Sequence, residues 1–457
     1  MIKMSLLSMT LALATTPAAA LADDASDLAA RGHYLAIAGD CAACHTAEPG
    51  DPFAGGKAIA TPLGQIFSTN ITPSTSAGIG DYTLADFDRA LRHGVRRDGS
   101  NLYPAMPYTA YAKISDEDMK ALYAYFHGAV MPVDKKPDHQ TALPFPFNLR
   151  FSMAGWNLLF ARETPDAPDA SQSPEWNRGR YLSEALGHCQ TCHTPRNLLM
   201  AEETSKGMSG ASLGQWYAPN ITSDRARGIG AWSAAQIAEY LKNGHSSVGS
   251  QAGGPMLEAI NMSFSKLSDP DLNAIATYIS SLPAVISEGH DKTSATGRPV
   301  TNDLSLMSGS ADAGQQIYAD NCATCHQSTG AGGRGLPALV ANAALTRPVA
   351  DNAVMAVLDG LSPPQGHDMP AFADKLDDRE VADLTNFLFR QFGDPSIQTT
   401  EQQVKILRAG GAPSNLIQLA QIGMVIAAVI LFAVIAGNSI LIARRRRRAR
   451  SRQPFAS

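Results

Sequence analysis

The longest hydrophobic run in the chain lies near its C-terminus. The stretch from Leu416 to Ala443 contains no charged residue and is followed by five consecutive arginines, Arg444 to Arg448. Few polar residues interrupt it, so a helix here would be apolar on every side, unlike a helix that lies on a membrane surface. An apolar run of this length predicts one transmembrane helix.

A second hydrophobic run, at the N-terminus, has the order of a secretory signal. Lys3 precedes an apolar stretch, and small residues then lead to Ala20-Leu21-Ala22, an A-x-A cleavage site. The positive-inside rule places the C-terminal arginines in the cytoplasm. Both signals therefore predict a single-pass protein of the cell inner membrane, with the region before Leu416 in the periplasm and the C-terminus in the cytoplasm.

Between these two runs, one helical pattern occurs three times. Each copy opens with a short helix that holds a glycine and an aromatic residue, and closes with a helix that starts with acidic residues. The opening helices contain Gly32-His33-Tyr34, Gly179-Arg180-Tyr181 and Gly314-Gln315-Gln316-Ile317-Tyr318, and the closing helices start near Ser115, Ser268 and Asp377. The glycine predicts close contact between helices, and the aromatic side chain is expected to pack. Repetition of Asn70-Ile71-Thr72 as Asn220-Ile221-Thr222 indicates that the first two copies arose by duplication.

All six cysteines fall in three copies of one motif. The copies are Cys41-Ala-Ala-Cys44-His45, Cys189-Gln-Thr-Cys192-His193 and Cys322-Ala-Thr-Cys325-His326. C-x-x-C-H is the sequence at which haem c is attached, through two thioethers and an axial histidine. Zinc needs about four ligands, and neither a redox pair nor a structural disulfide needs the histidine. The pattern predicts three covalently bound haem c groups, with the six cysteines as attachment points and the three histidines as axial iron ligands.

A methionine is the expected second axial ligand in each copy, because His/Met ligation raises the reduction potential and closes the iron to substrates. Met106 lies in Tyr103-Pro-Ala-Met106-Pro, and Met369 precedes Pro370, so prolines stiffen both segments. In the second copy Met256 follows Pro255 and is favoured, while Met262 stays an alternative.

Two other interpretations of these positions remain open. A methionine between helices is ordinarily a core side chain. His127, His245 and His367 are alternative ligands that would give bis-histidine sites, although a surface or core role is the ordinary one for each.

The expected fold is mainly α: three tandem class I cytochrome c-like domains and one C-terminal transmembrane helix. Proline-rich and polar stretches mark the boundaries. They divide the chain into a signal peptide (1–22), cytochrome c domain 1 (23–134), an interdomain connector (135–174), cytochrome c domain 2 (175–286), a linker (287–310), cytochrome c domain 3 (311–395), a tether (396–415), the transmembrane helix (416–443) and a basic cytoplasmic tail (444–457). Within the connector, the aromatic segment 148–160 is expected to pack between domains.

The net charge of the chain limits the kinds of partner that the exported part can bind. The formal net charge of −5 includes seven arginines after Ala443, so the exported part is more acidic than the whole chain. An acidic surface suits solubility or the steering of basic partner patches, and it disfavours nucleic-acid binding.

With these motifs in place, the chain resembles the triheme cytochrome c subunits of membrane-bound bacterial dehydrogenases for alcohol, gluconate and fructose. The most specific shared features are the three attachment motifs, Tyr103-Pro-Ala-Met106-Pro, the two Asn-Ile-Thr segments, Cys192-His193-Thr194-Pro195-Arg196 and Gly254-Pro255-Met256. The resemblance implies that Met106, Met256 and Met369 are the distal iron ligands. It also implies an electron-transfer subunit that has no catalytic residue of its own.

The same resemblance implies the partners. A quinoprotein, flavoprotein or molybdenum-type catalytic subunit would oxidise substrate in the periplasm, and the haems would pass electrons to ubiquinone or a terminal oxidase. A small accessory subunit is a further candidate partner. Two alternatives stay open: a cytochrome carrier linked to a terminal oxidase or a bc-type complex, and a multihaem peroxidase, which would need an iron with an open sixth position.

Overall fold

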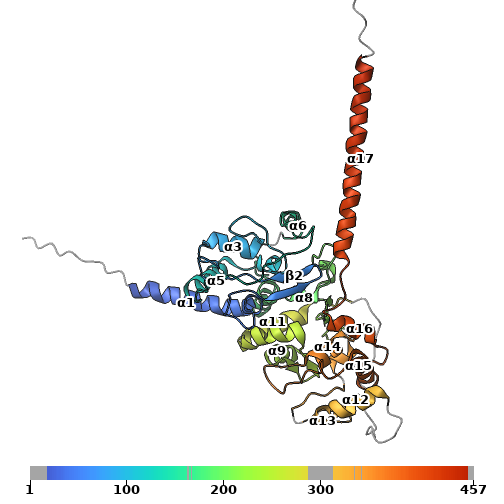
Figure 1. Ribbon diagram of the computed structural model, residues 1–457. Coiled ribbons are helices and arrows are strands. Elements are labelled where there is room, and N and C mark those ends of the chain that lie inside the picture. Colours follow the sequence, from blue (N-terminus) through green and yellow to red (C-terminus); the bar gives the residue numbers. More distant parts are fainter. Residues whose placement is uncertain are drawn as a thin grey trace, which may run out of the picture.

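The computed structural model describes residues 18–161, 164–165, 167–286, 312–333, 335–340 and 342–450 (Figure 1). Helices dominate these residues, and the strands among them form three two-stranded antiparallel sheets, β1-β2, β3-β4 and β5-β6. The helices gather into three units along the chain, followed by one long helix. The mainly helical class expected from the sequence is confirmed.

The first unit contains α1 (Ala18–Ala38), α2 (Cys41–His45), β1 (Ala58–Thr61), β2 (Gly64–Phe67), α3 (Leu84–His93), α4 (Tyr108–Tyr111) and α5 (Asp116–Gly128), and α6 (Ser152–Phe160) follows it. The second contains α7 (Pro174–Tyr181), the π-helical turn η1 (Leu182–Leu186), α8 (Cys189–His193), η2 (Thr204–Lys206), β3 (Ala211–Leu213), β4 (Trp216–Ala218), α9 (Ala234–Asn243), β5 (His245–Ser246), β6 (Ser250–Gln251), α10 (Gly254–Met262), η3 (Phe264–Lys266) and α11 (Asp269–Ser281). The third contains α12 (Ala313–Asn321), α13 (Ala323–His326), η4 (Ala343–Thr346), α14 (Asp351–Asp359), α15 (Asp378–Phe392) and α16 (Glu401–Arg408), and α17 (Leu416–Arg450) ends the described chain.

The same helix crossing recurs in all three units. The opening helix crosses the closing helix at its glycine, in the pairs α1 with α5, α7 with α11, and α12 with α15. A Cβ atom on Gly32, Gly179 or Gly314 would lie 1.9, 1.9 or 2.1 Å from the carbonyl oxygen of Ala121, Ala274 or Asp383, respectively. Any side chain would therefore push the helices apart, so the close contact expected from these glycines is confirmed.

The closing helices begin at capped residues, as their acidic starts predict. Ser115 accepts a hydrogen bond from the backbone N–H of Asp118, and Ser268 caps α11 in the same way. In α15, Asp377 and Glu380 form a reciprocal capping box. These caps satisfy backbone donors that a helix start otherwise leaves unpaired.

The first two units share one core and a reciprocal interface. A single cluster of buried apolar side chains runs through both of them, whereas the third unit has its own cluster, which Trp216 of the second unit joins. The Tyr34 hydroxyl of the first unit donates to Asp271 of the second, at 2.6 Å. The equivalent Tyr181 of the second unit donates to Asp118 of the first, also at 2.6 Å. Duplicated units thus contact each other through equivalent residues.

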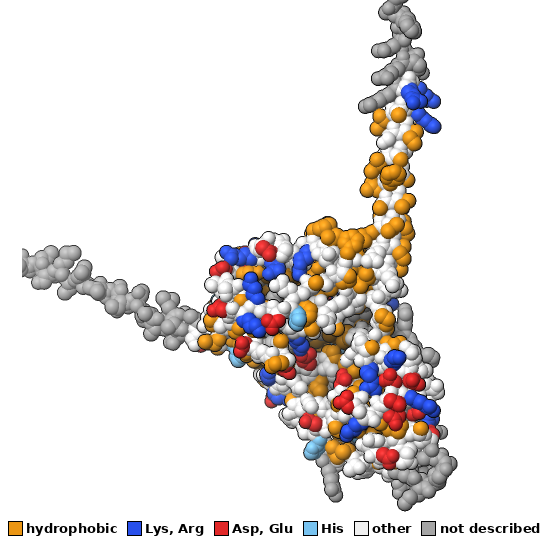
Figure 2. Space-filling view, in the orientation of Figure 1, with side chains coloured by type: hydrophobic (Ala, Val, Ile, Leu, Met, Phe, Trp, Pro, Cys, Tyr) orange, Lys and Arg blue, Asp and Glu red, His pale blue; other side chains and the backbone are white. Residues whose placement is uncertain are grey.

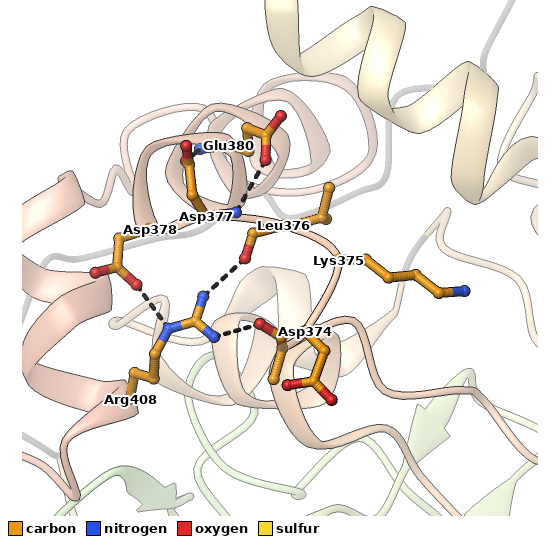
Figure 3. Close-up of a pocket in the computed structure, with 8 residues that line it drawn as sticks. Asp374, Lys375, Leu376, Asp377, Asp378, Glu380 and Arg408 are labelled. Carbon is orange, nitrogen blue, oxygen red and sulfur yellow. Dashed lines mark hydrogen bonds and ion pairs between the residues drawn. The ribbon is translucent and has the colours of Figure 1, made fainter.

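The segment 396–415, for which a tether is predicted, belongs largely to the third unit. It contains α16, whose Val404 and Leu407 are buried in the third unit's core. Arg408 donates to the Asp378 carboxylate at 2.7 Å and to the carbonyl oxygen of Leu376 at 2.9 Å (Figure 3). These bonds hold the end of α16 against the start of α15, where a free tether would have no such contacts.

The final helix, α17, projects alone from the folded units (Figure 1). The most apolar 18-residue window of its segment Leu416–Arg445 has a mean hydropathy of 2.7, and none of that window is buried within the protein. It is therefore a candidate membrane span, as the sequence predicts. The helix continues beyond the predicted end at Ala443, because arginine is a good helix former.

Three predicted segments lie outside the described residues in whole or in part. They are residues 1–17 of the predicted signal peptide, the predicted linker 287–310, and residues 451–457 of the basic tail. The described helix α1 begins at Ala18, ahead of the predicted cleavage site after Ala22.

Candidate functional site

Each C-x-x-C-H motif lies on a short helix that ends at its histidine. These helices are α2, α8 and α13, with Cys322 serving as the residue just before α13. One helical turn therefore carries each motif, so both thiols and the imidazole come from the same small element. In the first two units the residue before the motif, Asp40 or His188, has a left-handed backbone conformation that turns the chain into the motif helix.

The three motif histidines are oriented in the same way. The Nδ1 atom lies 2.7 Å from the Thr69 carbonyl oxygen in His45, 2.7 Å from that of Pro219 in His193, and 2.9 Å from that of Pro337 in His326. A carbonyl oxygen can only accept, so Nδ1 carries the proton and Nε2 keeps its lone pair. Such a bond fixes the tautomer and ring orientation that an axial iron ligand needs.

Burial keeps these imidazoles neutral. Loss of hydration lowers the pKa of His193 to about 4 and lowers the pKa of His45 and of His326 below the ordinary value. Each histidine is therefore uncharged at neutral pH, which is the form that binds a metal.

The first cysteine of each motif has the character of a structural group. Burial raises the pKa of Cys41 and of Cys189 to about 12 and that of Cys322 to about 11. A redox-active C-x-x-C pair shows the opposite, a lowered thiol pKa. Within the described part of the chain, no group of three or more His, Cys, Asp or Glu side chains is placed to hold a metal ion.

The second and third motifs open into one continuous cavity of about 320 Å³. Its lining includes Cys189, Cys192 and His193 of the second motif, Cys322, Cys325 and His326 of the third, and both Met256 and Met369. Most of the remaining lining is apolar, from side chains such as Trp216 and Ile237. Paired free thiols, a histidine with an available Nε2 and an apolar cavity fit haem c.

The methionine candidates occupy three different local structures. Met106 lies in the turn before α4, where its N–H donates to the Tyr103 carbonyl oxygen and its carbonyl accepts from Tyr108. Met369 is held in an isolated antiparallel bridge with Leu361. Met256 is in the first turn of α10, because Pro255 is well suited to the start of a helix.

The cavity separates the two candidates in the second unit. Met256 lines it, whereas Met262, at the other end of α10, is not among the lining residues. Six positions at about 100° per residue place the two side chains about 120° apart around the helix axis, so they face different sides of α10. The geometry favours Met256, the residue preferred from the sequence.

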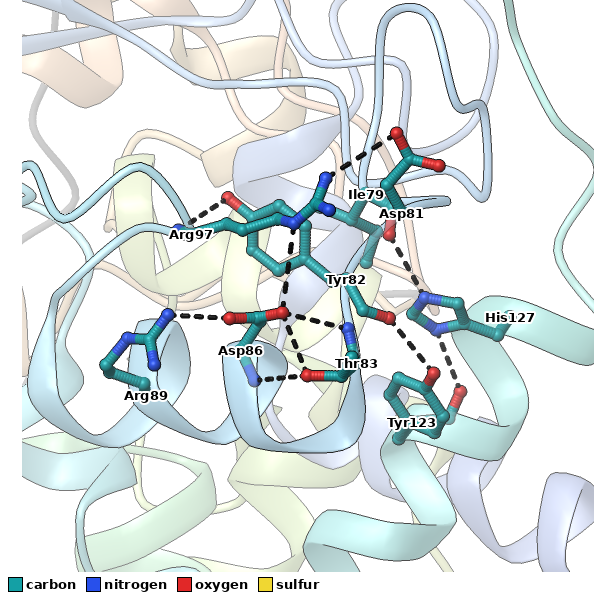
Figure 4. Close-up of polar contacts among 9 residues, drawn as sticks. All are labelled: Ile79, Asp81, Tyr82, Thr83, Asp86, Arg89, Arg97, Tyr123 and His127. Atoms are coloured by element: carbon teal, nitrogen blue, oxygen red, sulfur yellow. Dashed lines mark hydrogen bonds and ion pairs between the residues drawn. The ribbon is translucent and has the colours of Figure 1, made fainter.

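The alternative histidine ligands differ in their surroundings. Both ring nitrogens of His127 face carbonyl oxygens, Nδ1 that of Tyr123 at 3.3 Å and Nε2 that of Ile79 at 3.0 Å (Figure 4). Its ring also stacks on Tyr123, and the contact of Nε2 with Ile79 holds α5 to the chain before α3. His245 starts β5, and His367 lines the shared cavity near Met369.

Sequence reasoning missed one residue of this cavity, Arg347. It comes from the third unit, just after η4, but it lines the cavity close enough to Tyr217 and Tyr240 of the second unit to interact electrostatically with both. Loss of hydration lowers the pKa of this guanidinium, and its side chain forms no ion pair or hydrogen bond with the described residues. If haem occupies this cavity, such a poorly hydrated cation would be placed to bind a propionate. No local sequence signal marks Arg347.

Comparison with known proteins matches the chain to a family. Residues 29–129 match the cytochrome c family, and residues 309–388 match the family described as cbb3-type cytochrome c oxidase subunit III. The chain is also 43% identical to the fructose dehydrogenase cytochrome subunit of Gluconobacter japonicus, over 92% of this chain and 91% of the relative. The chain belongs to the dehydrogenase cytochrome c subunits.

Other members of these dehydrogenase cytochromes show the same extent of similarity. The gluconate 2-dehydrogenase cytochrome c subunit of Pantoea cypripedii is 40% identical over 87% of this chain and 94% of its own length. The cytochrome c subunit of the quinone-type alcohol dehydrogenase of Gluconobacter oxydans is 39% identical over 88% and 86%. The resemblance inferred from the motifs is therefore confirmed.

Membership of this family shows the general function of the chain. As a dehydrogenase cytochrome c subunit, the chain carries covalently bound haem c and transfers electrons within a membrane-bound dehydrogenase complex. The catalytic subunit of such a complex is therefore its partner.

Proposed function

We propose that this dehydrogenase cytochrome carries three haem c groups, one at each C-x-x-C-H motif. The observation that carries the proposal is the repeated Nδ1-to-carbonyl hydrogen bond, which leaves Nε2 of His45, His193 and His326 available in all three units. Met106, Met256 and Met369 are the proposed distal ligands. Haem c supplies one-electron chemistry, because its iron alternates between the ferrous and ferric states.

The proposed role of the three units is to relay electrons. The shared cavity supports this, because sites that open into one cavity bring their redox groups close together. Electrons would enter from a periplasmic catalytic subunit of the quinoprotein, flavoprotein or molybdenum type and leave to ubiquinone or a terminal oxidase. The chain's own residues hold and orient the haems and exclude water from them.

The proposed topology is a single pass through the cell inner membrane. The apolar segment of α17 would span the bilayer, with the arginines after Ala443 in the cytoplasm and the three units in the periplasm. An exported location also suits haem c, which is attached outside the cytoplasm.

One purification tests the haem count and the relay together. We expect the protein, affinity-purified from detergent-solubilised membranes, to contain three haems per chain by the pyridine haemochrome assay and intact-mass measurement. A dehydrogenase subunit should co-purify, and mass spectrometry would identify it. Its substrate should then reduce the haems in the visible spectrum. Two haems per chain, or haems that no co-purifying dehydrogenase reduces, would contradict the proposal.

A second candidate is a carrier that serves a terminal oxidase or a bc-type complex. The match of residues 309–388 to cbb3-type oxidase subunit III favours it for the third unit. Co-purification of haem-copper oxidase subunits in place of a dehydrogenase would establish this alternative.

A further inference from the structure

An exposed apolar surface surrounds α6 and stands out from the rest of the folded units. The exposed fractions of its side chains are 51% for Phe145, 74% for Phe151, 65% for Leu158, 60% for Leu159, 85% for Leu198 and 58% for Leu199. We call these six residues the α6 face. Figure 2 shows an apolar surface of this kind on the body beside the foot of α17. Contiguous exposed apolar residues of this size mark a surface that binds something.

The α6 face is not a loose segment. The Tyr108 hydroxyl donates to Asn157 of α6 at 2.7 Å, and the Tyr103 hydroxyl donates to the Phe147 carbonyl oxygen at 2.8 Å. The Trp156 Nε1–H donates to the Leu199 carbonyl oxygen of the second unit at 2.9 Å. The segment therefore packs between the first two units, as expected from its aromatic residues, while Phe151, Leu158 and Leu159 stay exposed.

The position of α17 sets the level of this face relative to the bilayer. The Gln421 side-chain amide donates to the Phe145 carbonyl oxygen at 3.1 Å, so the first turns of α17 lie beside the α6 face. The helix from Ile422 to Ala443 is about 22 residues, or roughly 33 Å, which matches the hydrocarbon thickness of a bilayer. If the arginines lie at the cytoplasmic boundary of the hydrocarbon core, its periplasmic boundary falls at Gln421 and Phe145.

The charge of the segment suits a lipid surface. From His139 to Ala161 the sequence contains no aspartate or glutamate, and its one lysine or arginine is Arg150, although the exported part of the chain is acidic overall. Trp156, Phe151 and Phe160 are residue types found on the apolar face of helices that lie in a membrane interface. An anionic bilayer would repel an acidic surface, but it does not repel this one.

We propose that the α6 face is a second membrane contact, in which the six apolar side chains enter the periplasmic leaflet beside α17. This inference rests on the proposed membrane span of α17. It goes further by seating the first unit on the bilayer, because Tyr103 and Tyr108 tie the α6 segment to the turn that carries Met106. The first haem site is thereby held at the membrane surface, within reach of a lipid-soluble electron acceptor.

A docking site for the dehydrogenase subunit is the rival occupant of this face. A water-soluble partner there would have to occupy the plane in which α17 enters the lipid, because the face and Gln421 lie at one level. The apolar interior of the bilayer therefore fits the α6 face better than a water-soluble subunit does.

Photo-crosslinking in nanodiscs tests the contact with the intact complex. The bilayer would contain phosphatidylcholine and phosphatidylglycerol, with a small share of phosphatidylcholine that carries a diazirine on its acyl chain. After irradiation and digestion, mass spectrometry should find lipid adducts on peptides covering 145–160 as well as 422–443. Peptides from α15 and α16 serve as the negative control, since they carry the polar surface of the third unit.

Two variants sharpen the test. Leu158→Glu with Leu159→Glu should lower adduct yield on 145–160 by about fivefold or more, because charged side chains leave the acyl region, while adducts on α17 and the haem content stay unchanged. Leu28→Glu, at an exposed apolar residue of α1, should change neither yield.

The outcomes distinguish this inference from the proposed span. Adducts on α17 without adducts on 145–160 would overturn the α6 contact alone, as would crosslinks from 145–160 to the dehydrogenase subunit in place of lipid. Adducts on 145–160 alone would overturn the span and support the contact. Adducts on neither would overturn both.

Discussion

At the residue scale, the sites depend on small polar contacts around each motif. A single backbone carbonyl fixes each histidine tautomer, and the same contact occurs in three units with different neighbours. The proposed distal ligands differ more, because Met106, Met256 and Met369 lie in a turn, a helix and a bridge. The motif histidines are thus held alike, whereas the proposed methionine ligands come from segments of different local structure.

The choice of distal ligand in the second unit gives a prediction. We expect Met256→Ala to abolish the iron–sulfur charge-transfer absorption of one haem and to lower that haem's midpoint potential, because the thioether stabilises the ferrous state. Met262→Ala should leave both unchanged, since Met262 does not line the cavity. Near-infrared absorption and redox titration of the purified protein measure the two effects. The reverse result would reassign the ligand to Met262.

Arg347 gives a second prediction at this scale. A nearby positive charge disfavours the ferric haem, so Arg347→Leu should lower one midpoint potential by on the order of tens of mV. Arg347→Lys keeps the positive charge, so its midpoint potentials should stay close to those of the unsubstituted protein. The measurement is a spectroelectrochemical titration with haem content as the control. Unchanged potentials in Arg347→Leu would show that the guanidinium acts on no haem.

At the element scale, each unit is built around one crossing of two helices. The opening glycine lets the helix axes approach until backbone touches backbone. The motif helix that follows contacts the opening helix or, in the second unit, the turn η1 that continues it. Capping of the closing helix by Ser115, Ser268 or Asp377 fixes where that helix starts. The motif helices are too short to be stable alone, so this crossing supports them.

Replacing a crossing glycine should therefore be costly. We expect Gly32→Ala to lower the free energy of unfolding by about 1–3 kcal/mol or more, because the new methyl group would overlap the Ala121 carbonyl. Gly128→Ala is the matched control: a Cβ there meets no atom within 4 Å, and alanine favours a helix. Thermal unfolding followed by circular dichroism compares the two. Equal stability of both variants would mean that the helices can separate without cost.

At the scale of the whole molecule, the units are joined in two different ways. The first and second share a core and the reciprocal contacts of Tyr34 with Asp271 and Tyr181 with Asp118. The third meets the second across the cavity that holds both motifs, with Trp216 as a shared core residue. The chain is thus a rigid pair of duplicated units with a more independent third unit.

This arrangement predicts how interface variants unfold. Tyr34→Phe and Tyr181→Phe each remove a hydrogen bond to a carboxylate, and each should destabilise the first two units by about 1.5–3 kcal/mol. The third unit has a separate core, so its unfolding transition should not move. Hydrogen exchange measured peptide by peptide separates the units. Faster exchange in α12 and α15 as well would show that all three units unfold together.

The sequence by itself determined the features that follow from local chemistry. The attachment motifs, their histidines, the crossing glycines and the candidate membrane helix are each encoded within a few consecutive residues or one uninterrupted run, because thioether attachment, close helix contact and bilayer thickness impose fixed local patterns. Most of the helical architecture could be predicted for the same reason.

The tertiary structure decided what depends on residues distant in sequence. It placed Met256 at the cavity and Met262 away from it, brought Arg347 of the third unit to the second unit's tyrosines, and packed α16 where a tether is predicted. It also exposed the leucines of α6 beside Gln421. No local pattern encodes these arrangements, because each depends on which surfaces remain after the units pack against one another.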